Sequence, residues 1–359
     1  MDVNEEAAYW LALLGTSQVK RQLAKRVIHR WCVIGQEPLA TLFDLGATEV
    51  ADRLGLSHAE AVQVLAAGPD AAVQRAGLDR LSGRGIGVIT RVDAAYPDSL
   101  VEHLPEERLP YFLFHAGDLE NLTQPGVAVL GAAEPSPQAQ SLVGGLTGAL
   151  ADEGHLLVGG YDRGVDRQAL EAGRDAGAAI TLVIPGGIET MGAIVQHLLP
   201  GRRADRVLIL SPFAPTAPYS DALAGSRLCL IGALGEVLVL VAPDRGPDEL
   251  PDLSGPFLRS RRALAWTGDR SGATEAWIDA GAQPFDGAEA GLAHILARFG
   301  AAPVDAPKGG GIDDVPGVEP IEFHDADSAI EALGQTGRVP DVLARRLREA
   351  RWDDDWENG

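Results

Sequence analysis

The chain has 359 residues, of which 46% are hydrophobic and 23% charged, enough for two or three domains with buried cores. Its formal net charge of −21 excludes a protein that coats nucleic acid with a generally basic surface, but leaves room for one local basic site. Cys32 and Cys229 are too few for a disulfide framework or a cysteine-ligated metal site, and the histidines lie singly along the chain. We therefore expect no bound metal.

The first residues predict a cytoplasmic location. Glu5 and Glu6 stand where a signal peptide would carry basic residues. The longest apolar stretch, 228–242, contains Glu236 and is too short to span a bilayer. We expect no membrane partner.

Residues 1–84 are predicted to form an all-helical domain. In the stretch 18–32, Leu23, Val27 and Trp31 recur at helical spacing. Further short helices are expected at 38–45, 47–54 and 57–67. The turn between the last two, LGLS, resembles the turn of helix-hairpin-helix and SAM-like modules, and an ordinary helix cap explains it equally well.

Five basic side chains flank the apolar stripe of the expected helix at 18–32. Long side chains that cover an apolar edge while their charges stay in water are the commoner explanation of such a run. A surface that binds phosphate groups or a partner is the alternative. The five residues are Lys20, Arg21, Lys25, Arg26 and Arg30.

From residue 85 onward, short apolar stretches alternate with helical stretches. Each apolar stretch lacks polar alternation, as expected for strands buried on both faces of a parallel sheet. Repeated β-α units predict an α/β fold with a doubly wound, Rossmann-like, mostly parallel sheet that follows the N-terminal all-helical domain. The predicted strands are 86–90, 127–130, 156–158, 180–184, 207–210, 237–241 and 264–266.

The predicted domain boundaries follow this change of pattern. A connector at 85–124 leads into the Rossmann-like domain at 125–302. Residues 303–359 begin with a glycine- and proline-rich linker and end in an acidic tail. Solubility is the ordinary role of such a tail, and a docking peptide anchored by Trp352 and Trp356 is the alternative.

The loops after the strands are where a doubly wound sheet binds its ligands. The first loop, GAAEPS at 131–136, offers a glycine and a helix N-terminus to a phosphate, but lacks the G-x-G-x-x-G spacing, so we expect no dinucleotide cofactor. In the second loop, GGYDRGVDR at 159–167, Arg163 can bind a phosphate, and Asp166 can cap the next helix or accept a hydrogen bond from a ribose or base. We expect an open pocket here, with Arg163 and Arg227 as surface side chains. The candidate residues are Gly131, Ser136, Gly160, Arg163, Gly164, Asp166, Gly187 and Arg227.

The order of these loops resembles the DNA-processing protein A family, also called DprA or Smf. The family's second loop reads serine-glycine-x-alanine-x-glycine-isoleucine-aspartate, which Gly160, Gly164 and Asp166 match. Residues 272–285 fit the stand-alone branch of the family, and the resemblance runs from about 94 to 286. The resemblance is also carried by YPDSL at 96–100, LPYFLFHAGD at 109–118, SPF at 211–213 and SRLC at 226–229.

Several positions depart from the family pattern. The family has glycine-serine-arginine where 131–133 reads GAA, so one phosphate-binding arginine that the resemblance implies is missing. Gly225 and Ser226 replace an arginine-asparagine pair, which leaves Arg227 alone. The resemblance implies the Rossmann-like fold and single-stranded DNA binding without enzymatic activity, with fewer of the family's arginines.

Three functions remain open at this point. The first is a non-enzymatic DNA-processing protein that binds single-stranded nucleic acid or a nucleotide, with Arg163 and Arg227 on phosphates. The second is a nucleotide sensor or phosphoribohydrolase of the SLOG superfamily: PGG at 185–187 resembles the hydrolase motif, but Glu189 replaces a glycine and Ala193 the catalytic glutamate. The third is a degenerate scaffold for a protein partner in a DNA-handling or defence assembly, which the missing arginines and the negative charge favour. A homodimer fits each of them.

Overall fold

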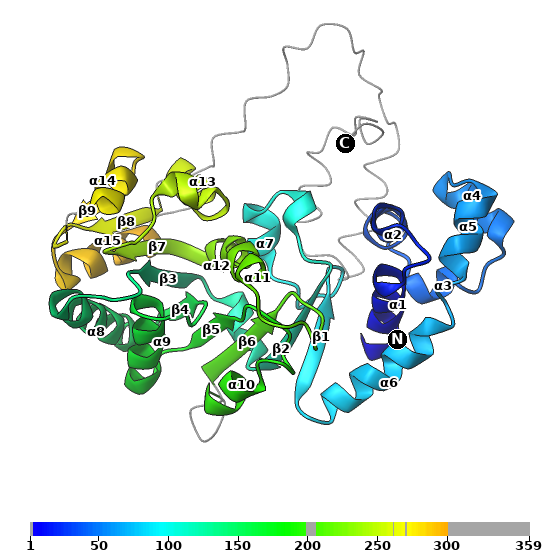
Figure 1. The fold of residues 1–359 in the computed structure, drawn as a ribbon, viewed down its shortest axis with the longest axis horizontal. Coiled ribbons are helices and arrows are strands. Elements are labelled where there is room, and N and C mark those ends of the chain that lie inside the picture. The colour runs from blue at the N-terminus through cyan, green and yellow to red at the C-terminus, as the bar shows by residue number, and fades with distance from the viewer. Residues whose placement is uncertain (1–2, 199–205, 261, 270, 301–359) are drawn as a thin grey trace, which may run out of the picture. The chain divides into compact units, whose positions relative to one another are not determined.

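The computed structural model of the chain is drawn in Figure 1. It describes residues 3–198, 206–260, 262–269 and 271–300. The predicted linker and acidic tail at 303–359 lie outside the described residues. In the described part of the chain, no helix is long and apolar enough to cross a membrane.

The chain divides into two compact units. Among the described residues, the helical unit comprises 3–96 and Pro110–Ala116. The Rossmann unit comprises Pro97–Leu109 and the described residues from Gly117 onward. Residues of the predicted connector are therefore shared between the two units.

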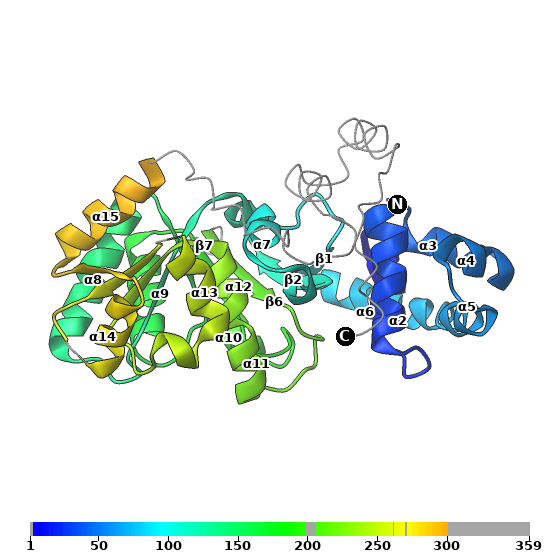
Figure 2. The same ribbon diagram turned by 90° about the horizontal axis from the view of Figure 1, so that it is seen from above.

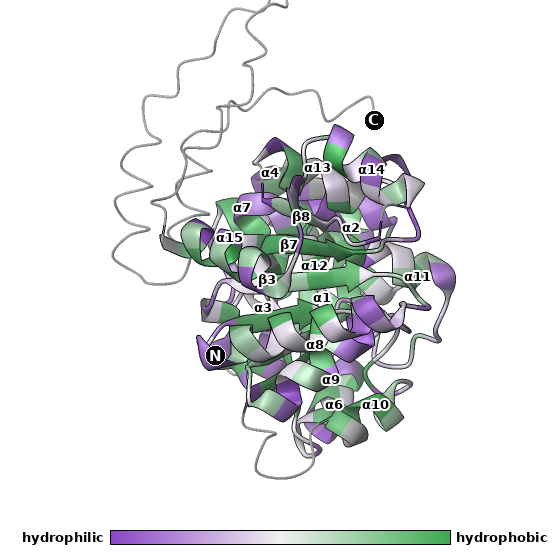
Figure 3. Cartoon of the chain, turned by 90° about the vertical axis from the view of Figure 1, so that its left-hand side faces the viewer, coloured by the Kyte–Doolittle hydropathy of each residue, from purple (hydrophilic) through white to green (hydrophobic). Residues whose placement is uncertain are grey.

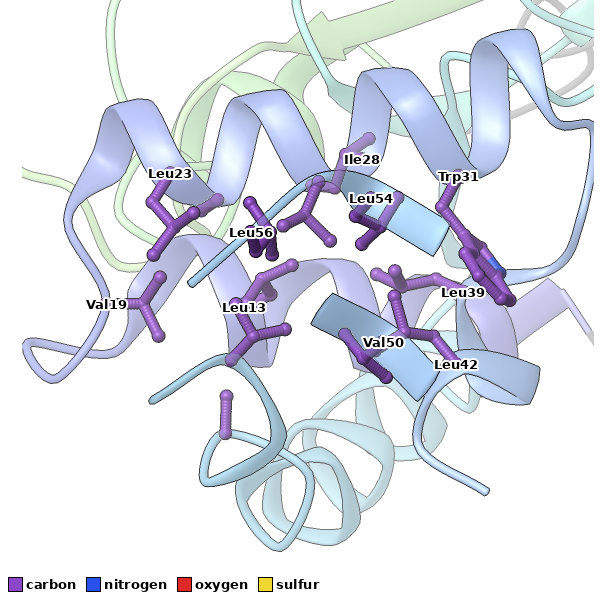
Figure 4. Packing of buried hydrophobic residues seen from close by; sticks show 14 of the residues in the cluster. Leu13, Val19, Leu23, Ile28, Trp31, Leu39, Leu42, Val50, Leu54 and Leu56 are labelled. Carbon is purple, nitrogen blue, oxygen red and sulfur yellow. The ribbon is translucent and has the colours of Figure 1, made fainter. Parts of the chain in front are cut away.

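Helices fill most of the helical unit, as the sequence predicts. Their apolar faces meet in one core, in which Leu13, Ile28, Trp31 and Leu42 are buried (Figure 4). The helices are α1 Val3–Gly15, α2 Arg21–Ile28, the π-helical turn η1 His29–Ile34, α3 Leu39–Leu42, α4 Ala47–Leu54, α5 His58–Leu65 and α6 Asp70–Ser82.

The helix expected at 18–32 is not regular throughout, because α2 passes into the π-helical turn η1. There the amide of Gly35 donates to the carbonyl oxygen of Arg30 at 3.0 Å. The indole N–H of Trp31 donates to the carbonyl oxygen of Pro38 at 3.0 Å, which fixes the wider turn against the start of α3. A single wide turn leaves no mark on the spacing of buried residues, so the sequence does not reveal it.

Two antiparallel strands complete the helical unit. β1 at Ile86–Thr90 pairs with β2 at Phe112–Gly117, with Ile86 opposite Ala116. β1 is a predicted strand. β2 is not among the predicted strands, because His115 interrupts its apolar run.

The Rossmann unit contains the predicted parallel sheet. Among the described residues its strand order is β6-β5-β4-β3-β7-β8-β9, and neighbouring strands are parallel. These buried strands form a hydrophobic layer, and polar residues lie on the helices outside it (Figure 3). The strands are β3 Gly126–Gly131, β4 Leu156–Gly159, β5 Ile180–Val183, β6 Val207–Ser211, β7 Gly235–Val241, β8 Ala263–Trp266 and β9 Gln283–Phe285.

Helices cover both faces of this sheet. α8 packs against α9 and α15, whereas α12 packs against α7 and α13 (Figure 2). Seen end on, α8 and α9 lie below the strands and α13 and α14 above them (Figure 3). The helices are α7 Asp98–His103, α8 Pro137–Asp152, α9 Val165–Ala176, α10 Gly192–Leu198, α11 Asp221–Ser226, α12 Leu228–Leu234, α13 Pro251–Arg259, α14 Gly272–Asp279 and α15 Ala288–Gly300.

The strand order reverses between β3 and β7. From β3 the chain proceeds through β4 and β5 to β6, then returns to the other side of β3 as β7 and continues to β8 and β9. In open α/β sheets, ligands bind beyond the carboxyl ends of the strands at such a reversal. The loops that follow β3 and β7, at 132–136 and 242–246, therefore flank the place where a ligand is expected.

Candidate functional site

Two glycines let the loops at the strand ends lie against each other. Gly164 has a φ of +92°, and a Cβ there would lie 2.1 Å from the carbonyl oxygen of Ala132. That oxygen also accepts from the amide of Val165 at 3.0 Å. A Cβ on Gly131 would lie 1.9 Å from the carbonyl oxygen of Val241, at the end of β7. Close approach of the chain to itself therefore requires glycine at both positions.

Asp166 is buried in the first turn of α9, where it holds the preceding loop rather than the amides of its own helix. Its carboxylate accepts from the amide of Gly160 at 3.1 and 3.2 Å and from the amide of Asp162 at 3.3 Å. Burial raises the pKa of Asp166 to about 7, the Asp162 carboxylate adds to the rise, and Arg227 opposes it. Both protonation states of Asp166 are therefore populated near neutral pH.

The expectation that Arg227 is a surface side chain is wrong, because the residue is fully buried. It stands between α11 and α12, and its Nη1 donates to the carbonyl oxygens of Gly160 at 2.9 Å and Val183 at 3.2 Å. A Cβ on Gly160 would lie 2.6 Å from Nη2, so only glycine leaves room for the guanidinium. Arg227 thus joins the ends of β4 and β5 from beneath the loop.

Asp162 supplies the counterion of Arg227. Its Oδ2 accepts from Nη2 at 2.5 Å. The side chain of Asp162 is 54% exposed, so the ion pair reaches from solvent to a buried cation. The Nε of Arg227 is buried and has no hydrogen-bond partner among the described residues. A buried donor without a partner costs free energy, so this guanidinium keeps capacity for a further acceptor.

A second carboxylate lies at the reversal of the strand order. The exposed Asp244, in the loop after β7, accepts from the amide of Ala133 at 2.8 Å. Ser136 caps α8, and its Oγ accepts from the amide of Ala139 at 3.2 Å. The loop after β3 thus binds a carboxylate of the same chain where nucleotide-binding proteins of this fold hold a phosphate.

Arg163 lies on the surface, as the sequence predicts. Its side chain is 73% exposed and donates to Glu134 at 2.8 Å. An exposed pair of this kind contributes little to stability, so the arginine can exchange its partner readily. Beside it, the ring of Tyr161 lies 4.9 Å from the guanidinium of Arg167, and its hydroxyl donates to Glu171 at 2.6 Å.

Gly187 belongs to the loop after β5, which the loop after β6 holds in place. Its amide donates to the carbonyl oxygen of Ala217 at 2.8 Å, and a Cβ would lie 2.1 Å from the carbonyl oxygen of Pro215. The hydroxyl of Ser211, at the end of β6, donates to the carbonyl oxygen of Gly186 at 2.8 Å. The glycine at 187 is therefore explained by packing between the two loops.

Three of the five basic residues along α2 and η1 are engaged within the helical unit. Arg26 pairs with Glu60 at 2.8 Å, and Nη1 of Arg30 donates to the carbonyl oxygen of Leu54 at 2.6 Å. The ammonium group of Lys25 lies 5.6 Å from the centre of a tyrosine ring. The two remaining basic residues are Lys20 and Arg21, which are exposed, as Arg26 and Arg30 also are.

Asp162 and Asp244 are not among the predicted site residues, although both contact the predicted loops. Asp162 occupies a position at which the family pattern has alanine. This departure from the pattern is a sequence signal that could have identified Asp162 as a site residue. Asp244 lies outside every motif, and its contact follows only from the strand order. No three His, Cys, Asp or Glu side chains in the described ranges lie together as metal ligands would.

The parallel sheet, its reversal between β3 and β7 and the close glycine loops define a Rossmann-like α/β protein. A family model described as DNA recombination-mediator protein A matches residues 87–249, from β1 to the short helix η5 at Pro247–Glu249. The match confirms the resemblance to the DNA-processing protein A family over this segment.

Solved structures with a similar fold include DNA processing protein A from Streptococcus pneumoniae, with 21% identity, coverage of 80% of this chain and 97% of that chain, and a TM-score of 0.58. The protein of the same name from Helicobacter pylori, whose structure is described for its single-stranded DNA binding mode, has 20% identity, coverage of 59% and 96%, and a TM-score of 0.47. The molybdenum cofactor carrier protein of Chlamydomonas reinhardtii has 16% identity, coverage of 50% and 99%, and a TM-score of 0.36. No curated protein matches the chain.

Proposed function

We propose that this protein is a non-enzymatic DNA-processing protein that binds single-stranded nucleic acid, or a nucleotide, beyond the carboxyl ends of β3, β4 and β5. The observation that carries the proposal is the buried guanidinium of Arg227 beneath Gly160, with one nitrogen that has no partner in the described part of the chain. Such a cation binds a phosphate oxygen through a short, charge-assisted hydrogen bond. The family match over 87–249 supports nucleic acid as the source of the phosphate.

In this proposal Arg163 makes a second phosphate contact. It lies on the same loop as Gly160, and its exposed partner Glu134 is easily exchanged. Asp166 positions the loop through its bonds to backbone amides and does not contact the ligand. We also propose a cytoplasmic location and a linker with an acidic tail at 303–359.

A fluorescence-polarisation titration with a labelled oligothymidylate at several salt concentrations tests the proposal. Affinity should fall as salt rises, and each phosphate contact on a single strand contributes about 0.7 to the log–log slope. Arg163→Ala should reduce the slope by about that amount. Arg259→Ala is the matched control, because Arg259 is also an exposed arginine of the Rossmann unit but ends α13. Binding that does not depend on salt contradicts the proposal.

A scaffold that binds a protein partner is a second candidate, favoured by a different observation. The positive groups at the strand ends are already paired with carboxylates of the chain, Arg163 with Glu134 and Arg227 with Asp162. Internal pairing weakens the field that attracts a polyanion. A folded protein without affinity for the oligothymidylate at low salt would favour the scaffold.

A further inference from the structure

The ion pair between Asp162 and Arg227 is asymmetric. The side chain of Arg227 is 0% exposed, whereas that of Asp162 is 54% exposed. The carboxylate therefore lies on the solvent side of Nη2. A phosphate that reached Nη2 from solvent would have to replace it.

The remaining bonds of the guanidinium leave one edge incompletely paired. Nη1 is bound to the backbone oxygens of Gly160 and Val183, which belong to the fold itself. Nε and Nη2 form the edge that two oxygens of a carboxylate or phosphate bind side by side. Asp162 uses only Nη2, and Nε has no partner among the described residues. Asp162, whose side chain is exposed, therefore binds only one of the two nitrogens of this edge.

The surroundings of Asp162 make its departure less costly than that of an ordinary counterion. Its carboxylate lies close enough to the buried Asp166 carboxylate for the two to repel each other. Its backbone amide, which donates to Asp166, stays in place when the side chain moves. Movement of Asp162 into solvent relieves this repulsion and leaves the loop backbone bonded as before.

We infer that Asp162 sets the affinity of the strand-end site for phosphate groups, because its carboxylate competes with the ligand for the Nε–Nη2 edge of Arg227. The inference rests on the proposed function, since it concerns the same site. Binding is then an exchange of a carboxylate for a phosphate at one guanidinium, and the free protein holds the site in its self-paired state. The observed affinity is lower than the intrinsic one by the fraction of molecules in which the edge is free.

Substitution of Asp162 tests the inference in the full chain with the labelled oligothymidylate as probe. Asp162→Ala should tighten binding about tenfold, the effect of one charge-assisted hydrogen bond, and steepen the salt slope by about 0.7. Asp162→Asn keeps an oxygen for Nη2 without the charge and should fall between the wild type and Asp162→Ala. Asp152→Ala is the matched control, because it changes the net charge equally at the exposed far end of α8.

Asp162→Ala in a protein that also carries Arg227→Gln tests whether the gain in affinity depends on Arg227. Arg227→Gln keeps amide donors for the loop carbonyls but removes the charge. In this background Asp162→Ala should bring no gain. A gain of equal size there would overturn the inference, because the new contact would then lie elsewhere. If Arg227→Gln does not fold, the affinities of Asp162→Ala, Asp162→Asn and Asp152→Ala still test the inference. It is overturned if Asp162→Ala binds no more tightly than Asp152→Ala.

The outcomes separate this inference from the proposed function. A wild type that binds with salt dependence, together with Asp162→Ala that equals Asp152→Ala, overturns only the inference. A wild type that fails to bind while Asp162→Ala binds supports the inference and overturns the proposed function for the unmodified chain. If neither the wild type nor Asp162→Ala binds, the proposed function and the inference are both overturned. Competition by inorganic phosphate or thymidine monophosphate distinguishes a nucleotide site from one that requires a strand.

Discussion

Gly164 shows how narrowly a single residue constrains the strand-end site. Its φ of +92° disfavours any other residue, and a Cβ at this position would lie only 2.1 Å from the Ala132 oxygen. Gly177, at the end of α9, has the same φ of +92°, but its ψ of 16° places it in the left-handed region, whereas the ψ of Gly164 is −131°. A Cβ at Gly177 would meet no atom within 4 Å, so this position shows the cost of left-handed strain without steric contact.

We predict that Gly164→Ala lowers the free energy of unfolding by about 2–6 kcal/mol, the sum of strain in a backbone conformation that disfavours side chains and of overpacking. Gly177→Ala should cost only the strain, about 1–2 kcal/mol. Urea unfolding of both variants measures the difference. Equal losses would mean that the contact between the loops after β3 and β4 relaxes freely.

Asp166 gives the site a dependence on pH with a definite sign. Its pKa is about 7 in the folded chain, against an ordinary value of 3.8. Between these values the folded state keeps a proton that the unfolded state has lost, so this group makes stability fall as pH rises from about 4 to 7. Asp166→Asn should remove this component. Thermal melts of wild type and variant across that range test the prediction, and parallel pH profiles would contradict it.

The basic residues along α2 and η1 form the rival nucleic-acid surface among the helical elements. Arg26 and Arg30 are exposed but bound to Glu60 and to the carbonyl oxygen of Leu54. Lys20 and Arg21 are exposed charges without such a bond in the described part of the chain. If the strand ends bind the nucleic acid, the double change to alanine at these two positions should leave oligothymidylate affinity within about twofold and the salt slope unchanged.

Arg163→Ala, measured beside this double variant, gives the opposite expectation. Its affinity and slope should both fall, because it removes one phosphate contact at the strand ends. The reverse pattern, a loss for the α2 variant and none for Arg163→Ala, would identify the helical unit as the nucleic-acid surface.

Strands of the parallel sheet could be predicted because burial on both faces leaves an unbroken apolar run, as in Val237–Val241 of β7. β9 could not be predicted in this way, because it is an edge strand of three residues in which Gln283 and Pro284 are exposed and form no apolar run. The same apolar runs also predict the positions of the glycine-rich loops, because each loop begins where a run ends. Periodicity therefore gives the elements and the positions of the loops between them.

The direction of side chains in the site could not be predicted in this way. Arg227 was expected on the surface, yet its guanidinium lies beneath Gly160, because the start of α12 faces the sheet and loop carbonyls offer it acceptors. A guanidinium binds a carbonyl oxygen or a phosphate with the same geometry, so the residue type does not reveal which one it meets. The contact of Asp244 with Ala133 likewise depends on β7 lying beside β3, more than a hundred residues away in the chain.

At the scale of the whole molecule, the chain is strongly acidic, and the charge is unevenly distributed. Residues 303–359 carry six basic and fourteen acidic residues, which contribute −8 to a net charge of −21. Their glycine- and proline-rich start indicates a linker that crosses few contacts, and α15, which packs on α8, ends before it at Gly300. The acidic segment and the Rossmann unit are therefore expected to be separable.

We predict that a chain that ends at residue 302 keeps the cooperative melt of the full chain and binds oligothymidylate more tightly at low salt. Removal of a net charge of −8 reduces repulsion between protein and strand. At about 1 M salt the Debye length is about 3 Å, so the affinities of the two chains should converge. A gain that persists at high salt would instead indicate that the acidic segment occupies the binding site directly. Loss of the melt would show that it belongs to a folded core.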